Sequence, residues 1–203
     1  SLSFEFRARA WNTRFDEQAA RRIAWPEGEW PREAASTFEP MLFIDHGFVE
    51  PYDATPVETL VERWTGGNAK SQPPVVVAKW LAGEVARRFQ PEIGFGVPDG
   101  VAADGYQPGR SLGTIQAINV TGAQIAAERM AGSPMDMVLL LTALYREAGL
   151  PARIVVGYVA GDEGGRRDVR RGNDEPELGP YAWVEFALYD ETQSSLDTSL
   201  TWV

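Results

Sequence analysis

Residues that could do catalytic chemistry occur at three places in this chain, each beside a pattern that predicts secondary structure. Ser133-Pro134-Met135-Asp136 precedes a long apolar run, Tyr181-Ala182-Trp183 begins an alternating segment, and Asp197-Thr198 follows a turn-like pair of serines. A hydroxyl or a pair of carboxylates at such places could serve nucleophilic or acid–base chemistry. Thiol chemistry is excluded, because the 203 residues include no cysteine.

The same residues also have structural interpretations. Ser133 fits the N-cap of the following helix, Pro134 its first residue, and Asp136 the acidic third residue of a capping box. Asp136 and Asp197 could form a carboxylate pair, but we favour the capping role for the first. His46 is the only histidine, so no second histidine can join it in a metal site, and we favour a structural or surface role for it. No metal and no cofactor are expected.

A long central helix and two strands must position these residues. Nearly every residue between Met137 and Tyr145 is apolar, on all sides of the helix, which places this helix at the centre of the fold. Gly149 ends it, Pro151 prevents its continuation, and residues 153–159 form a strand rich in Val and Ile. Residues 181–189 alternate between apolar and polar side chains and predict a second strand, with Trp183 in the core or in a cleft wall.

Three more helices are predicted upstream. Thr55 is the expected N-cap of the first, Glu58 completes a capping box with it, and Gly66 ends the helix. A second helix runs from the Pro-Pro pair at 73–74 to about residue 90, with valine, leucine and phenylalanine spaced by four. Thr121 heads a capping-box pattern that predicts a short third helix to about residue 130.

Residues 1–40 and 41–203 are predicted to be different parts of the chain. Residues 2–11 alternate in polarity, which predicts a half-buried strand that could end a preceding β-rich domain, and the rest to residue 40 is expected to be an irregular connection. Residues 91–120 predict a long loop rich in Gly and Pro, and residues 162–180 an exposed loop with four arginines among acids. Because the chain lacks an initiator Met, we expect a fragment of a longer protein.

Composition limits the partners of this chain. An apolar content of 44% and seven Trp predict a folded domain. The formal charge of −10 disfavours nucleic acid and anionic membrane surfaces as partners. No run of 18 apolar residues occurs, so this fragment is not expected to insert into a membrane. The compartment stays open: we expect a soluble domain, either cytoplasmic or part of a membrane-attached protein.

The order of these parts resembles the transglutaminase-like superfamily, which shares the papain-like cysteine protease fold. In that family Gly-x-Cys begins the central helix, Gly-(Ile/Leu)-Pro-Ala-Arg ends it, and a His-Ala-Trp strand and an Asp-Pro-Thr segment follow. The matching segments here are Gly149-Leu150-Pro151-Ala152-Arg153, Gly157-Tyr158, Tyr181-Ala182-Trp183 and Asp197-Thr198. The resemblance is closest over residues 132–203. It extends over 39–131, where residues 39–45 are similar to the linker of bacterial members and 75–90 to the next helix.

The resemblance implies that the catalytic triad is degenerate. Counting back from Arg153 puts Pro134 in the place of the cysteine, while Tyr181 stands where the histidine should be and Asp197 keeps the acid. Proline offers no nucleophile and no N–H group for an oxyanion. Tyrosine, with a reference pKa of about 10, is a poor base at neutral pH. No catalytic residue is therefore expected.

These observations predict an α+β domain with a transglutaminase/papain-like core, in which a central buried helix packs on an antiparallel β-sheet with helices N-terminal to it. The expected function is a catalytically inactive domain that binds a peptide or protein segment, or serves as an assembly module of a larger bacterial protein. The candidate cleft residues are Pro134, Met135, Tyr181, Trp183 and Asp197. Two alternatives stay open: a hydrolase with a rearranged non-cysteine site at Asp136, Asp197 or His46, and a purely structural spacer.

Overall fold

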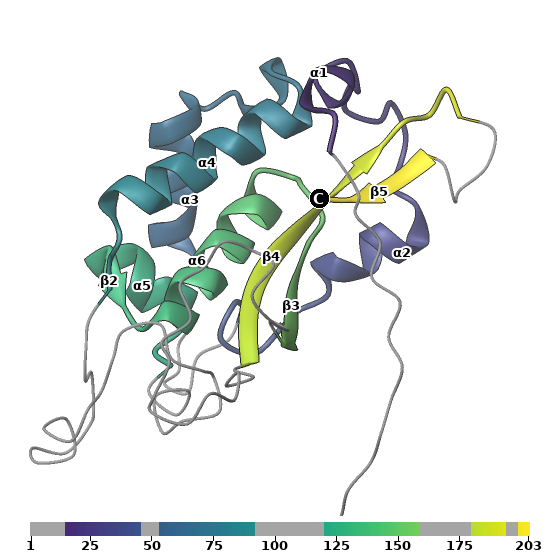
Figure 1. The fold of residues 1–203 in the computed structure, drawn as a ribbon. Helices are drawn as coiled ribbons and strands as arrows, with labels where there is room; N and C mark the ends of the chain where they lie inside the picture. Colours follow the sequence, from purple (N-terminus) through teal and green to yellow (C-terminus); the bar gives the residue numbers. More distant parts are fainter. Residues whose placement is uncertain (1–14, 46–52, 92–119, 159–179, 194–198) are drawn as a thin grey trace, which may run out of the picture.

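The computed structural model describes residues 15–45, 53–91, 120–158, 180–193 and 199–203, which form a group of helices and a three-stranded sheet (Figure 1). The elements, in chain order, are α1 (Glu17–Ala20), α2 (Arg32–Ala35), the 3-10 helix η1 (Ser36–Phe38), α3 (Thr55–Thr65), η2 (Ala69–Ser71), α4 (Pro74–Arg88), β1 (Gln90–Pro91), α5 (Ala123–Arg129), β2 (Ala131–Gly132), α6 (Pro134–Glu147), β3 (Ala152–Tyr158), β4 (Pro180–Tyr189) and β5 (Leu200–Trp202).

Helix α6 lies at the centre of the molecule, as its uniformly apolar sequence predicts. It contacts α3, α4 and α5 as well as strands β3 and β4. Leu140 and Leu144 are completely buried. The hydroxyl of Tyr145 donates a hydrogen bond to the Ala78 carbonyl at 3.1 Å, and its ring meets Phe186 edge-on at 5.5 Å. The predicted α+β architecture with a central buried helix is confirmed.

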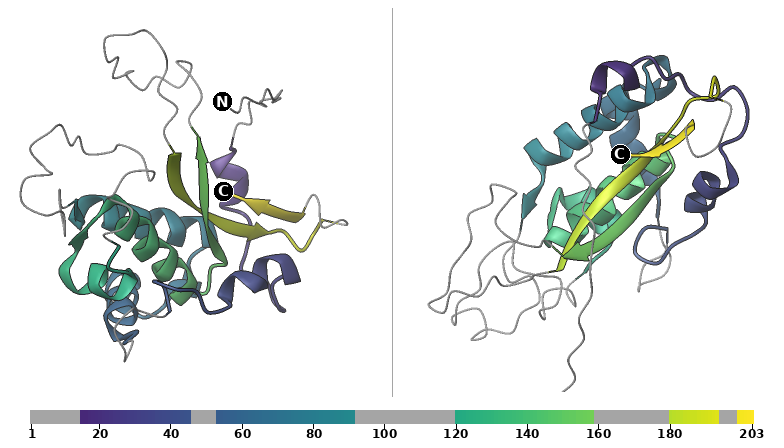
Figure 2. Two further views of the ribbon diagram at one scale, coloured as in Figure 1. Left: turned by 90° about the horizontal axis from the view of Figure 1, so that it is seen from below. Right: turned by 45° about the vertical axis from the view of Figure 1, so that its right-hand side comes forward.

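The sheet is antiparallel, with the strand order β3-β4-β5. Helices α3 to α6 gather on one side of it and α2 lies on the other (Figures 1 and 2). Ala152 and Phe186, which are direct partners in the β3–β4 register, are buried beside α6. Val156 and Trp183 lie farther along the same two strands and are exposed. Val156 lies on the same face as Ala152 and Trp183 on the opposite face, so the described residues leave both faces of the sheet open at this end.

The segment before α3 is more regular than its sequence predicts. Residues 12–40 were expected to be irregular, but the described part of them includes α1, α2 and η1. Each is one turn long, and α1 has a side-chain cap, since Asp16 Oδ1 accepts from the backbone N–H groups of Gln18 and Ala19 at 3.0 Å. Trp25 attaches this segment to the helices, since its Nε1 donates to the Gln72 carbonyl at 2.6 Å. The predicted strand at residues 2–11 lies outside the described residues.

Two predicted helix caps are wrong. Helix α3 begins at Thr55 itself, and Asp53 Oδ1 accepts the Thr55 N–H at 2.9 Å in place of the expected threonine cap. Helix α5 begins after Gly122 without a side-chain cap, and no described residue hydrogen-bonds to the buried hydroxyl of Thr121. The predicted end of α3 is confirmed, because Gly66 adopts the left-handed conformation with φ of 66°. In the described ranges, no helix is long and apolar enough to cross a bilayer.

The central position of α6 predicts where the stability of the domain is concentrated. Leu144→Ala should lower the free energy of unfolding by about 3 kcal/mol, because Leu144 is 0% exposed and the substitution leaves a cavity among helices and strands. Leu42→Ala is the matched control, since Leu42 is 50% exposed. It should change stability by less than ~0.5 kcal/mol. Urea denaturation of both variants gives the comparison, and similar losses would contradict a core centred on α6.

Candidate functional site

The N-terminus of α6 is closed by its own side chains. Ser133 Oγ accepts the Asp136 N–H at 3.1 Å, and Asp136 Oδ2 accepts both the backbone N–H and the hydroxyl of Ser133 at 2.9 and 2.8 Å. The capping box predicted at these two residues is therefore confirmed. Because Ser133 is buried and its hydroxyl proton is held by Asp136, the geometry favours a structural role over a nucleophilic one.

The Asp136 carboxylate also binds a second segment of the chain. Its Oδ1 accepts the backbone N–H groups of Thr121 and Gly122 at 2.7 and 2.9 Å. The side chain is 0% exposed, so its charge is stabilised by three N–H groups, one hydroxyl and the positive end of the α6 dipole. A carboxylate with all these donors and no access to solvent is poorly suited to acid–base catalysis.

Two glycines allow close backbone approaches in this network, one to the Asp136 carboxylate and one to the Phe43 carbonyl. A Cβ atom on Gly132 would lie 2.9 Å from Asp136 Oδ2. A Cβ atom on Gly122, which has φ of 97°, would lie 3.1 Å from the Phe43 carbonyl oxygen. That same oxygen accepts the Ala123 N–H at 2.7 Å. The network around Asp136 therefore continues from α6 through the start of α5 to the segment at residues 41–45.

The structure describes only part of the predicted cleft. Pro134 is the first residue of α6 and is exposed, and Met135 beside it is partly buried against the core. The backbone of Tyr181 pairs with Gly157 in the β3–β4 register. The side chain of Tyr181 and all of Asp197 lie outside the described residues, as do His46 and the arginine-rich loop. The grouping of Pro134, Tyr181 and Asp197 into one cleft stays a prediction.

Trp183 is a surface residue. It is 40% exposed on β4, and its Nε1 donates to Glu185 Oε1 at 3.2 Å. The sequence left two positions open for this side chain, the core and a cleft wall, and the core position is wrong. The alternation of β4 explains the result, because Phe186 and Leu188 occupy the face that packs on the helices and Trp183 lies out of step with them.

Sequence reasoning missed the contacts of Arg153, the arginine of the Pro-Ala-Arg motif. Its Nε and Nη2 donate to Glu185 Oε2 at 3.0 and 2.8 Å, and its guanidinium lies 3.9 Å from the ring centre of Trp202. These residues come from β3, β4 and β5, so the motif arginine joins the three strands of the sheet. The alternation of both strands could have indicated the pair, since residues 153 and 185 are direct register partners.

The described residues show no metal centre. Within the mapped ranges, no group of three or more His, Asp or Glu side chains could hold an ion. The arrangement at the start of α6 is therefore one of capping and close backbone contact, without a nucleophile at the first helical residue.

The Asp136 network predicts a large effect on stability. Asp136→Ala should lower the free energy of unfolding by about 3 to 5 kcal/mol, because it leaves three N–H groups and one hydroxyl without their acceptor. Asp16→Ala is the control, since Asp16 also caps a helix but is exposed, and about 1 kcal/mol is expected. Thermal and urea unfolding measure both, and equal losses would contradict the central role of Asp136.

Comparison with known proteins gives the family of the C-terminal half. Residues 115–203 match the profile of the Transglutaminase-like superfamily. A candidate cysteine protease from Cytophaga hutchinsonii is 14% identical over 92% of this chain and 51% of its own, with a TM-score of 0.49. The periplasmic domain of TgpA from Pseudomonas aeruginosa, bound to ethylmercury, is also 14% identical, over 85% of this chain and 48% of its own, with a TM-score of 0.43.

The chain spans about half the length of these two solved structures. No curated protein sequence matches it significantly. The profile match includes α6, the Pro-Ala-Arg motif and all three strands of the sheet. Residues 115–203 of this chain therefore belong to the transglutaminase-like superfamily.

Proposed function

We propose that this chain is a non-catalytic transglutaminase-like module that binds a peptide or protein segment within a larger protein. The observation that carries the proposal is Pro134. It is the exposed first residue of α6, the place that the family resemblance assigns to the nucleophile, in a chain without cysteine.

The chemistry of residue 134 argues against acyl transfer. A cysteine enzyme of this kind needs a thiolate at the helix N-terminus and a neighbouring base to take its proton. Proline supplies neither an ionisable atom nor a backbone N–H. The resemblance puts Tyr181 in the position of the base, so two of the three members of the triad are replaced. Losing one member already removes most of the rate in enzymes of this type.

The alternative of a rearranged hydrolase loses support at Asp136. A catalytic carboxylate must reach substrate, but this one is fully buried and accepts four hydrogen bonds. Asp197 and His46 lie outside the described residues, so their part in that alternative stays a prediction.

A binding role is supported by exposed apolar side chains at the uncovered end of the sheet. Trp183 and its register partner Val155 lie on neighbouring strands, and Trp183 presents an indole ring to solvent. Exposed aromatic rings of this kind are typical anchor points in protein interfaces. The purely structural spacer stays the competing interpretation, and binding measurements separate the two.

The absence of turnover can be measured directly. Purified protein should show no incorporation of amines into glutamine peptides and no peptide hydrolysis above the buffer rate, because it has no nucleophile at residue 134. Activity that co-purifies with the protein and disappears in Tyr181→Phe or Asp197→Asn would overturn the proposal. As a control for the site itself, Pro134→Cys with Tyr181→His should react with iodoacetamide about tenfold faster than Pro134→Cys alone, since the histidine favours the thiolate.

Peptide binding should depend on Trp183. Peptides selected from a random phage-displayed library against the intact chain should bind Trp183→Ala at least tenfold more weakly, because the indole supplies most of the apolar contact. Trp80→Ala is the matched control, since Trp80 is another exposed tryptophan, at 50%, on helix α4, and its loss should leave the affinity unchanged. Fluorescence polarisation gives both dissociation constants. Failure to select any peptide, or equal effects of the two variants, would favour the spacer.

A further inference from the structure

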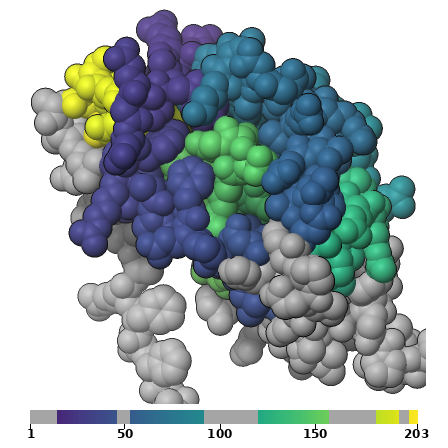
Figure 3. All heavy atoms as spheres, turned by 180° about the vertical axis from the view of Figure 1, so that it is seen from behind, coloured from purple at the N-terminus to yellow at the C-terminus, as the bar shows by residue number. Residues whose placement is uncertain are grey.

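A hollow lies at the far end of α6 from Pro134. It has a volume of about 190 Å³ and is lined by Phe38, Ile44, Asp45, Ala54, Val57, Ala143, Arg146 and Glu147. In Figure 3 the green C-terminal end of α6 is visible in a depression between the purple N-terminal segment and the blue helices. Arg146 is twelve residues beyond Pro134, or roughly 18 Å along the helix axis, so the hollow is separate from the predicted cleft.

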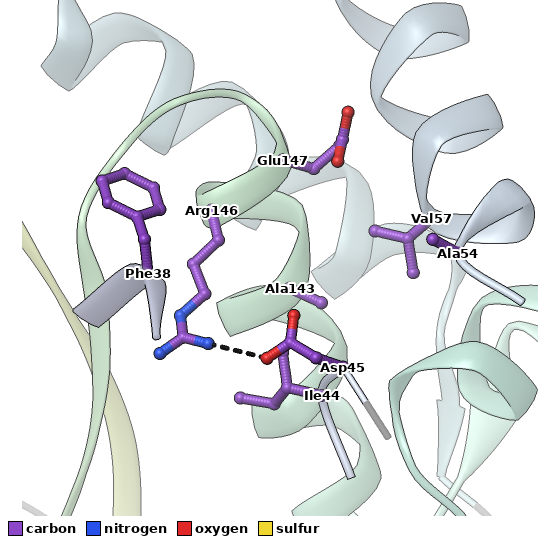
Figure 4. Close-up of a pocket in the computed structure, with 8 residues that line it drawn as sticks. All are labelled: Phe38, Ile44, Asp45, Ala54, Val57, Ala143, Arg146 and Glu147. Atoms are coloured by element: carbon purple, nitrogen blue, oxygen red, sulfur yellow. Dashed lines mark hydrogen bonds and ion pairs between the residues drawn. The ribbon is translucent and has the colours of Figure 1, made fainter. Parts of the chain in front are cut away.

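The Arg146 side chain enters this hollow with part of its hydrogen-bonding capacity unused (Figure 4). Its side chain is only 10% exposed. Nη1 donates to Asp45 Oδ2 at 3.1 Å and to the Glu39 carbonyl at 3.4 Å, and Nε donates to the Ala152 carbonyl at 3.4 Å. In the part of the chain that the structure describes, Nη2 has no acceptor. Nη2 is open to solvent, since it is not among the fully buried atoms without a partner, and it can donate to a carbonyl oxygen that a ligand brings.

Glu147, at the rim of the same hollow, is a carboxylate with no counter-ion among the described residues. Partial burial raises the pKa of Glu147, and the negative charge of Glu58 on α3 raises it further. No hydrogen bond or ion pair links Glu147 to another described residue. With Asp45 and Arg146 already paired, the charge of the hollow is negative by one unit, so a cationic group is favoured there.

The remaining wall of the hollow is apolar. Ile44, Val57 and Ala143 contribute aliphatic side chains from three different segments. An aliphatic stem can pack on such a surface while its charged end stays at the rim, as lysine and arginine side chains do. The hollow therefore combines one hydrogen-bond donor, one carboxylate that no described residue pairs with, and an apolar floor between them.

We propose that this hollow binds the lysine or arginine side chain of a partner peptide. The aliphatic stem packs on Val57 and Ala143, the cationic end pairs with Glu147, and a backbone carbonyl of the peptide accepts from Arg146 Nη2. The inference rests on the proposed function for the class of partner, but it names a different place and a specific side chain.

The test uses two small probes that differ only in the ε-ammonium group, which one has and the other lacks. Nα-acetyl-lysine N-methylamide and Nα-acetyl-norleucine N-methylamide are titrated into the ¹⁵N-labelled full chain, and amide chemical shifts are followed. The lysine probe should shift the amides of Ala54, Val57, Ala143 and Glu147, with a dissociation constant on the order of millimolar. The norleucine probe should bind at least fivefold more weakly, because it lacks the cation.

A pair of variants identifies the carboxylate. Glu147→Gln should weaken binding of the lysine probe at least fivefold, while Glu128→Gln, an exposed glutamate on α5, should leave it unchanged. The spectrum of each free variant reports whether the fold is intact. Equal binding of the two probes, an unaffected Glu147→Gln, or no shift of these amides would overturn this inference. Shifts confined to β4 around Trp183 would also overturn it, while supporting the proposed peptide-binding role.

Discussion

The hydrogen bonds of the buried Asp136 carboxylate are the interactions on which the elements around the N-terminus of α6 depend. A desolvated charge is costly, and here it is stabilised by hydrogen bonds from residues 121, 122 and 133 together with the dipole of α6. Because Ala123 in turn donates to the Phe43 carbonyl, the segment at 41–45 is fixed to the same network. One side chain therefore determines where α5, β2 and this segment meet the central helix.

The same segment is also attached to the opposite end of α6. Arg146, in the last turn, bonds to the Asp45 carboxylate and to the Glu39 carbonyl. The segment is therefore bound to the start of α5 by a backbone hydrogen bond and to the end of α6 by an ion pair, and charge-assisted bonds of the second kind are stronger than neutral ones. These contacts hold the helix in place without involving Pro134, its first residue.

Patterns that act over short distances could be predicted from the sequence, and long-range contacts could not. The central helix, its Ser133–Asp136 capping box and both long strands follow from hydrophobic periodicity and cap chemistry. The capping-box pattern failed at Thr55. The Asp53 carboxylate accepts the Thr55 N–H, which the Glu58 carboxylate would accept in a capping box. The donors from Thr121 and Gly122 to Asp136 are fifteen and fourteen residues distant, and no local rule brings them together. The exposure of Trp183 depended on which face of β4 the helices cover.

The contacts of Arg153 change what the Pro-Ala-Arg motif tells an observer. Its guanidinium lies over the Trp202 ring and bonds to Glu185, so it links the strands of the sheet. These contacts give the motif a mechanical role that is independent of any reaction. The motif is thus a marker of architecture, and an enzymatic reaction cannot be assigned from it alone.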